Sequence, residues 1–302
     1  MRWQVNTARS FVALNLPGYE ALRRWKRKRS GYQPDLSNLG STIVDLRSQA
    51  DLLKANGLSF AGKAVLEIGS GWFPVVPLLY RCMGARQVVM TDINRYMDQG
   101  TLDTARAFVL ESLPELAGRL GFDPDQPWLR QGRTFEGLGL VYRAPFEPAG
   151  SGIVVDCVTS RTVLEHIPPQ ELARLSRAWL SLLSPDGFML HSVDHSDHRQ
   201  HGDKRLSRID FLTWSETGWD ILTRLGKKQW RLRHPDYHRL FGSAGFDLAD
   251  EATVTDPKAV DDARRLFLKY PYDSLYTPEE LGVLLSHYLL RPRGAALALA
   301  AE

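Results

Sequence analysis

The sequence predicts an α/β protein with a mostly parallel sheet and helices on both of its faces. Short apolar runs alternate along the chain with helical patterns, which favours a parallel sheet. Several of these runs are apolar at nearly every position, as is typical of strands covered on both faces. The last two runs follow one another without a clean crossover helix, which indicates an antiparallel edge. The expected strands are residues 64–69, 87–93, 140–146, 152–160, 188–193, 246–254 and 281–292.

Helical segments are expected between these strands. Residues 41–57 repeat apolar side chains at helical spacing and end at Gly57, a stop signal. Pro168 and Pro169 introduce a helix that runs to about residue 183, because proline suits the first helical turn. A turn at residues 184–187 follows it. Further helices are expected over residues 1–35, 75–83 and 236–246.

The chain of 302 residues is long enough for one large domain with appendages. We expect an N-terminal helical extension over residues 1–58 and the main α/β domain over residues 59–302. Two insertions, at about residues 95–138 and 194–234, exceed what a minimal sheet needs. We expect them to form a cap over the substrate.

Composition indicates an ordinary globular protein in a reducing compartment. Hydrophobic residues make up 43% of the chain, the net charge is +3, and the two cysteines form no framework. No apolar run is long enough to span a bilayer, so we expect a cytoplasmic protein. Six basic residues crowd positions 23–29. That segment is a solvated helix face, a contact for membrane headgroups or a contact for nucleic acid. The basic run is short and no RNA-binding module accompanies it, so we expect no nucleic-acid partner.

The stretch VLEIGSGWFP, residues 65–74, places two glycines directly after an expected strand. Gly69 and Gly71 let the backbone approach a ligand at the carboxyl end of the sheet. Dinucleotide sites need a third glycine, and Pro74 stands in its place. S-adenosylmethionine has no pyrophosphate, and its two cationic groups suit an acid such as Glu67. Asp92 ends the next strand, where an acid can accept both ribose hydroxyls.

Four segments carry a resemblance to class I S-adenosylmethionine-dependent methyltransferases. VLEIGSG resembles the first motif of that superfamily, and VVMTDIN resembles the second. VDCVTSRTVLEHI resembles its fourth-strand segment, and LSPDGFMLHSV resembles the turn and fifth strand. The resemblance implies a Rossmann-like sheet of seven strands whose last pair is a reversed hairpin. It makes residues 59–302 a methyltransferase domain with S-adenosylmethionine as cofactor.

The resemblance also implies which residues contact the cofactor. The loop and the second strand supply Glu67, Gly69, Ser70, Gly71, Asp92 and Ile93. Adenine is expected beside Ala144, Pro145 and Phe146, and the methionine end beside Ser160 and Arg161.

Residues 191–201 hold four of the eight histidines of the chain, directly after the fifth strand. The cluster supplies a general base, binds a divalent metal that orients the acceptor, or is a solvated polar loop. We favour the base, with Asp197 and His198 as the functional pair and His191 as a further candidate. Glu165 accepts a proton or binds the cofactor ammonium, unless it caps the next helix. A bound divalent metal remains an alternative, but we do not predict one.

The second insertion is rich in tryptophan and arginine. Trp214, Arg231 and Arg233 could bind an acceptor that has a flat face and an anionic group, or they belong to an ordinary cap core. The segment RLRHPDYHRLFGSAGFDL, residues 231–248, resembles a stretch of bacterial family members encoded with glycan or natural-product pathways. With this resemblance, we expect a methyltransferase acting on a small molecule, at oxygen, in glycan-precursor or secondary-metabolite biosynthesis. The alternatives are carbon methylation of an anionic molecule such as a diphosphate, methylation of RNA or protein, and a non-catalytic binding protein. The sequence leaves the oligomeric state open.

Overall fold

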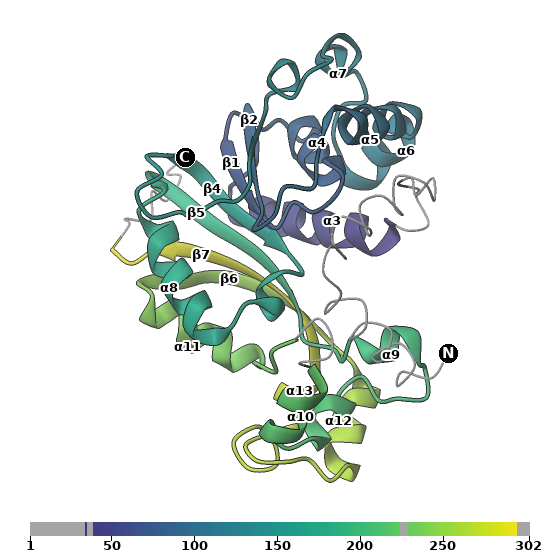
Figure 1. The fold of residues 1–302 in the computed structure, drawn as a ribbon, viewed down its shortest axis with the longest axis vertical. Helices are drawn as coiled ribbons and strands as arrows, with labels where there is room; N and C mark the ends of the chain where they lie inside the picture. The colour runs from purple at the N-terminus through teal and green to yellow at the C-terminus, as the bar shows by residue number, and fades with distance from the viewer. Residues whose placement is uncertain (1–33, 35–38, 224–228, 295–302) are drawn as a thin grey trace.

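The structure, a computed structural model, describes residue 34 and residues 39–223 and 229–294 (Figure 1). Apart from Pro34, the expected helix over residues 1–35 lies outside these residues, as does its basic segment. Among the helices of the described part, none has the length and apolar character that crossing a bilayer requires.

A seven-stranded sheet with the order β3-β2-β1-β4-β5-β7-β6 forms the centre of the molecule. All neighbouring pairs are parallel except those made by β7, which runs antiparallel to both β5 and β6. The predicted fold class is confirmed, including the reversed last strand. The strands are β1 (Ala64–Ile68), β2 (Gln87–Thr91), β3 (Leu140–Arg143), β4 (Val155–Arg161), β5 (Leu183–Asp194), β6 (Phe246–Thr255) and β7 (Val283–Pro292).

The strand order reverses between β1 and β4, which lie side by side at the centre of the sheet. Ligands of open α/β sheets bind at such a switch point, beyond the carboxyl ends of the strands. The loops after β1, β2, β4 and β5 all begin at this edge, because these four strands are parallel.

The helices between residues 40 and 131 cover one face of the sheet, and a shared hydrophobic core joins them to Val65 and Met90. The predicted insertion over residues 95–138 is part of this layer, because Leu102, Val109 and Leu116 belong to the same core. The elements here are α3 (Gly40–Ala55), α4 (Val75–Cys82), α5 (Gln99–Glu111), α6 (Leu113–Leu120), α7 (Pro127–Gln131) and the 3₁₀ turn η1 (Glu136–Leu138).

The opposite face is covered by α8 (Pro169–Leu180) and α11 (His234–Ser243) (Figure 1). Trp179 of α8 and Phe241 of α11 pack there against Leu66 and Met189. Leu66 belongs to this core while its neighbour Val65 belongs to the other, which explains why β1 is apolar throughout.

A small lobe stands beyond the carboxyl edge and has a core of its own (Figure 1). Phe211 and Trp219 come from the second predicted insertion, while Ala259, Tyr272 and Leu281 come from the connection between β6 and β7. The helices of that connection were not predicted. The lobe contains α9 (Arg199–Gly202), η3 (Asp210–Thr213), α10 (Glu216–Thr223), α12 (Pro257–Arg265) and α13 (Pro278–Gly282).

The predicted turn at residues 184–187 lies inside β5 rather than before it. Val155 pairs with Leu183, and the next pair along the two strands is Cys157 with Phe188. Four residues of β5 therefore lie opposite one residue of β4. The proline and glycine of this segment are accommodated as a bulge, and β5 begins earlier than expected.

Candidate active site

The glycine loop follows β1 at the carboxyl edge of the sheet. Gly69 has a φ of +73° and Gly71 a φ of +72°, in the left-handed region that favours glycine. A Cβ atom on Gly69 would lie 2.6 Å from Cγ2 of Val163, too close for a real contact. The N–H groups of Gly69 and Ser70 donate to the Thr91 carbonyl at 2.9 and 3.0 Å. The loop is thus held between the end of β2 and the segment after β4.

Asp92 lies directly against this loop. Its Oδ2 accepts a hydrogen bond of 3.1 Å from the Gly71 N–H, and its side chain is half-buried. Ile93 follows with 79% of its surface exposed. The structure therefore brings together the predicted loop, its acid and an apolar side chain open to solvent.

An aromatic surface that the sequence did not predict borders the loop. Trp72 stacks on Tyr96 with ring centroids 4.4 Å apart. The Tyr142 hydroxyl of β3 accepts from the Tyr96 N–H at 2.8 Å and fixes this segment. The sequence alone could not indicate this contact, because Trp72 follows β1 and Tyr96 follows β2, and their proximity depends on the strand order.

The segment predicted to lie beside adenine follows β3, the neighbour of the strand that leads to Asp92. Ala144 is half-buried and Pro145 is exposed, while Phe146 packs against the core under α8. These residues lie at the same edge as the glycine loop, and their contact with a cofactor stays a prediction.

Glu67 is buried within β1, with only 4% of its surface exposed. Burial raises the pKa of Glu67 to about 7, although Ser70 and Arg161 act in the opposite direction. Its Oε2 has no hydrogen-bond partner among the described residues. A cation that reached this oxygen would stabilise the ionised form.

Ser160 and Arg161, predicted to lie beside the methionine end of the cofactor, end β4, where Ser160 pairs with Ile68, the last residue of β1. The buried Ser160 hydroxyl shares a hydrogen bond of 2.8 Å with Nδ1 of His191. Arg161 donates to Asp45 of α3 at 3.2 Å. Ser160 is therefore committed to the core, whereas Arg161 remains half-buried and close enough to lower the pKa of Glu67.

His191 is not placed to act as a base. Its ring is fully buried and stacks on Phe241 of α11, with centroids 5.7 Å apart. Burial lowers the pKa of His191 to about 3, so the imidazole is neutral and inaccessible at pH 7. The side chain faces the core because it lies inside β5, upstream of the edge where ligands bind.

His198 pairs with Asp194 rather than with Asp197. Nε2 of His198 lies 3.2 Å from Oδ2 of Asp194, the last residue of β5. Burial opposes ionisation of Asp194, yet hydrogen bonds from His198 and Ser196 hold its pKa at about 2. The predicted histidine thus has an ionised carboxylate partner, four residues earlier instead of one.

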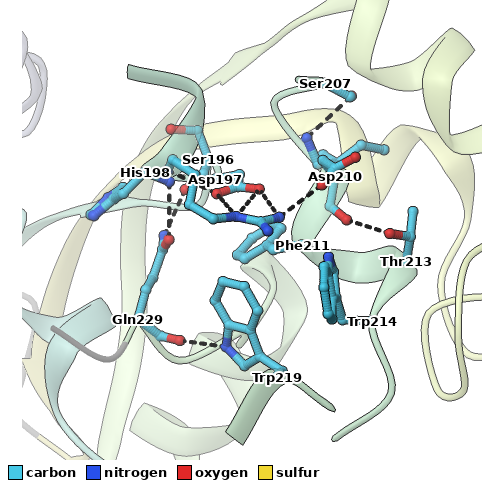
Figure 2. A network of polar contacts seen from close by, with 12 residues as sticks. Ser196, Asp197, His198, Ser207, Asp210, Phe211, Thr213, Trp214, Trp219 and Gln229 are labelled. Atoms are coloured by element: carbon cyan, nitrogen blue, oxygen red, sulfur yellow. Dashed lines mark hydrogen bonds and ion pairs between the residues drawn. The ribbon is translucent and has the colours of Figure 1, made fainter. Parts of the chain in front are cut away.

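Asp197 is the centre of a buried ion-pair network (Figure 2). Its carboxylate accepts a hydrogen bond of 2.6 Å from the Arg199 guanidinium, which also donates to Asp210 at 2.8 Å. The His198 ring points away from Asp197, while the His198 N–H donates to the Gln229 side chain at 3.2 Å. The predicted Asp197–His198 pair is therefore wrong, because Arg199 occupies the carboxylate.

Glu165 lies in the 3₁₀ turn η2 (Leu164–His166), just after β4. Thr162 precedes the turn with a φ of +48°, a strained conformation for threonine that often marks a functional site. Glu165 is 1% exposed, and neither carboxylate oxygen has a hydrogen-bond partner among the described residues. Burial and the nearby charge of Asp194 raise the pKa of Glu165 well above its ordinary value. Burial therefore favours the protonated, neutral form of this group.

Glu165, His166 and His198 come together at this edge. One nitrogen or oxygen of each lies within 4.8 Å of the others, so the three could hold a metal ion. The rings of His166 and His198 are 5.0 Å apart. His166 was not predicted, because its position beside His198 depends on where η2 and the loop after β5 meet.

Arg231 and Arg233, predicted to bind substrate, are buried structural residues. Arg231 donates to the carbonyls of Phe211 and Trp214 at 2.9 and 2.6 Å and to Glu216. Arg233 donates to the carbonyls of His195, Leu281 and Val283. Arg231 thus braces the lobe internally, and Arg233 fastens the lobe to the loop after β5, which leaves both unsuited to an external anion. Trp214 lies in the same network, 5.7 Å from the Arg199 guanidinium.

Comparison with known proteins places the chain in a family. A family model described as a methyltransferase domain matches residues 44–279. No curated protein matches the chain closely enough in sequence to count as a relative.

The fold is similar to several solved structures. An S-adenosylmethionine-dependent methyltransferase from Mesorhizobium loti is 17% identical, with 81% of this chain and 97% of that one covered and a TM-score of 0.44. The 1,6-didemethyltoxoflavin-N1-methyltransferase of Burkholderia thailandensis is 15% identical, with coverage of 92% and 91% and a TM-score of 0.45. The magnesium protoporphyrin IX methyltransferase of Synechocystis PCC 6803 is 16% identical, with coverage of 90% and 94% and a TM-score of 0.46.

With its strand order, its glycine loop closed by Asp92 and a family match over most of its length, the chain belongs to the methyltransferase domain family and is an S-adenosylmethionine-dependent enzyme of the class I fold.

Proposed function

We propose that the enzyme methylates a hydroxyl oxygen of a small molecule in glycan-precursor or secondary-metabolite biosynthesis. The observation that carries the proposal is the Asp194–His198 pair next to the buried Glu165, at the ends of β5 and β4. We place the reaction in the cytoplasm, where the buried, unlinked Cys82 and Cys157 stay reduced.

The cofactor fits the residues after β1 and β2. A backbone without Cβ atoms at Gly69 and Gly71 allows close approach, and the Asp92 carboxylate suits the two ribose hydroxyls. The buried Oε2 of Glu67 suits a cationic group. When bound, S-adenosylmethionine supplies an electrophilic methyl group on a sulfonium. The protein then has to hold the acceptor in line with that carbon and take up its proton.

His198 is the proposed general base. Its Nε2 is engaged by the ionised Asp194, which fixes the ring and leaves Nδ1 as the nitrogen that takes a proton. The side chain is 29% exposed, so an acceptor hydroxyl can reach it. Asp194 then stabilises the imidazolium that forms.

Glu165 is the proposed orienting group. A neutral carboxylic acid in a buried position can donate a hydrogen bond, which an ionised carboxylate cannot do. Both oxygens of Glu165 are buried, so we propose that it acts through its neighbours His166 and His198, whose ring nitrogens lie within 4.8 Å of its carboxyl oxygen. The proposal does not use the anion-binding role that the sequence predicted for Arg231 and Arg233.

The test is methyl transfer to a panel of hydroxylated small molecules, followed by S-adenosylhomocysteine formation, in two matched variants. His198→Ala is expected to lower turnover by about 10²- to 10⁴-fold, as for a lost acid–base group. His201→Ala is the control, because His201 is exposed and lies 3.9 Å from Asp194. It should change turnover by no more than a few-fold. Equal effects of the two substitutions would remove His198 from the role of base.

A further inference from the structure

We propose that His234, His238 and Glu251 form a binding site for a divalent transition-metal ion of the zinc type. The site lies between α11 and the edge strand β6, apart from the proposed catalytic residues. It does not depend on the proposed methyl-transfer chemistry.

The three side chains converge on one point. Nε2 of His234 lies 2.9 Å from Oε2 of Glu251, and Nε2 of His238 lies 2.7 Å from the same oxygen. The two imidazole rings, four residues apart on one helix, have centroids 4.4 Å apart. One ligand atom from each residue lies within 4.8 Å of the others. Ligands of a tetrahedral zinc ion are about 3.3 Å apart, so the two nitrogen–oxygen distances need to open by only about half an ångström.

A bulge in β6 aims the carboxylate at the helix. Leu248 pairs with Leu290 of β7, and the next pair along is Asp250 with Leu289. The extra residue, Ala249, shifts the alternation of the strand, so that Glu251 pairs with Tyr288. Because Tyr288 and Leu290 belong to the core under α8 and α11, Glu251 is on the α11 face. Without the bulge that position would belong to Asp250.

The bulge gives Asp250 a different partner. Its carboxylate accepts from the Asn56 side chain, just after α3, at 2.7 Å. Two consecutive acids of β6 are thereby sent to opposite faces of the sheet, and only Glu251 reaches the histidines.

The two imidazole rings pack against Tyr288 and are partly exposed to solvent. The His234 ring stacks on Tyr288, with centroids 5.8 Å apart and an angle of 15° between the planes, and His238 meets the same ring edge to face. Side-chain exposure is 14% for His234, 34% for His238 and 27% for Glu251. The ligand atoms are therefore fixed, yet an ion and its remaining water ligands can reach them from solvent.

The donor set selects the class of ion. Two imidazole nitrogens and one carboxylate suit zinc and its neighbours, whereas magnesium and calcium prefer oxygen ligands. Each histidine would bind through Nε2 in its neutral form with the proton on Nδ1, and the metal takes the place of the Nε2 protons that now point at Glu251. The bound ion would fasten α11 to the exposed edge of the sheet.

The experiment measures zinc binding to the untagged, EDTA-stripped protein by calorimetry. The native chain is expected to bind one zinc ion at this site, with a rise in melting temperature. His238→Ala and the conservative Glu251→Gln should each weaken that binding at least about tenfold, since even the loss of a supporting group costs that much. His198→Ala, which alters the other histidine cluster, should leave it unchanged.

Cobalt provides a second readout that does not depend on stability. Visible absorption bands of bound Co²⁺ report imidazole coordination and should be lost in Glu251→Gln, whose fold is checked by circular dichroism. The proposal is overturned if the native protein binds neither ion. It is equally overturned if binding survives both substitutions at the site, or if His198→Ala abolishes it.

Discussion

The cofactor side and the acceptor side of the active site are held in different ways. The glycine loop is fixed through its own main-chain N–H groups, which donate from Gly69 and Ser70 to the Thr91 carbonyl and from Gly71 to the Asp92 carboxylate. The loop after β5 is fixed by side chains that belong to the lobe. There Asp197 is paired with Arg199, and further residues brace the turn from positions far along the chain.

The acids of the two sides differ accordingly in their ion pairing and in their pKa. Near the glycine loop, a buried acid without a counter-charge in contact keeps a raised pKa, as Glu67 does. In the acceptor loop, Asp197 is fully buried but ion-paired, and its neighbour His198 is left to an ionised Asp194. Asp197 therefore holds the loop in place, and Asp194 and His198 are the pair that we propose for the reaction.

The largest effect is expected from breaking the ion pair of the acceptor loop. Asp197→Ala leaves the Arg199 guanidinium, 12% exposed, without its main partner, and should lower the free energy of unfolding by about 3–5 kcal/mol. Urea denaturation measures this. Asp125→Ala is the matched control, because the Asp125–Arg130 pair is long at 3.8 Å and largely exposed, and it should cost less than about 1 kcal/mol. Equal costs for the two substitutions would mean that the buried Asp197–Arg199 pair contributes no more to stability than an exposed pair does.

The next effect concerns Glu67 on the cofactor side. Its pKa of about 7 in the folded protein lies above the ordinary value of 4.5, so the folded state binds the proton more tightly than the unfolded state. The native protein without cofactor should therefore lose stability as pH rises from about 4.5 to about 7, by on the order of 3 kcal/mol. Glu67→Gln removes this loss, and its stability relative to the native protein should rise across that window.

Urea denaturation at pH 4 and pH 8 checks this prediction for Glu67. A difference between variant and native protein that is the same at both pH values would mean that burial does not control this carboxyl group.

A smaller effect is expected for Asp92, which contacts the loop and the proposed ribose. Asp92→Asn keeps the shape of the side chain but weakens charge-assisted hydrogen bonds worth about 1.5–3 kcal/mol, so S-adenosylmethionine should bind about 10- to 100-fold more weakly. Calorimetry measures the affinity. Asp103→Asn, on the exposed side of α5, is the control and should bind as the native protein does. Unchanged affinity in Asp92→Asn would show that this acid does not contribute to cofactor binding.

The cofactor side could be predicted from the sequence because its geometry is local. Gly69 and Gly71 follow a strand directly, and Asp92 ends the neighbouring strand, so the parallel pairing of β1 with β2 is enough to bring them together. Ser160 shows the limit even here. Its position in β4 was predicted, but its direction was not, because strand alternation sends it to His191 in the core.

The acceptor side could not be predicted because its geometry depends on long-range packing. The choice between Asp194 and Asp197 as the partner of His198 is decided by Arg199, which claims Asp197. Arg233 was read as an anion ligand, yet its partners include carbonyls of α13 and β7, about fifty residues further on. A polar sequence pattern does not distinguish a buried arginine that binds the backbone from one that waits for a substrate.

The small core of the lobe has a consequence for how such an enzyme can change. Phe211 and Trp219 share it with Tyr272 and share none of the packing beneath the glycine loop. Under the proposed function, exchanging side chains in the lobe is expected to move His198 and reshape the space for the acceptor, while the glycine loop keeps its position. New substrates can then be acquired by altering this one module, with little cost to the rest of the protein.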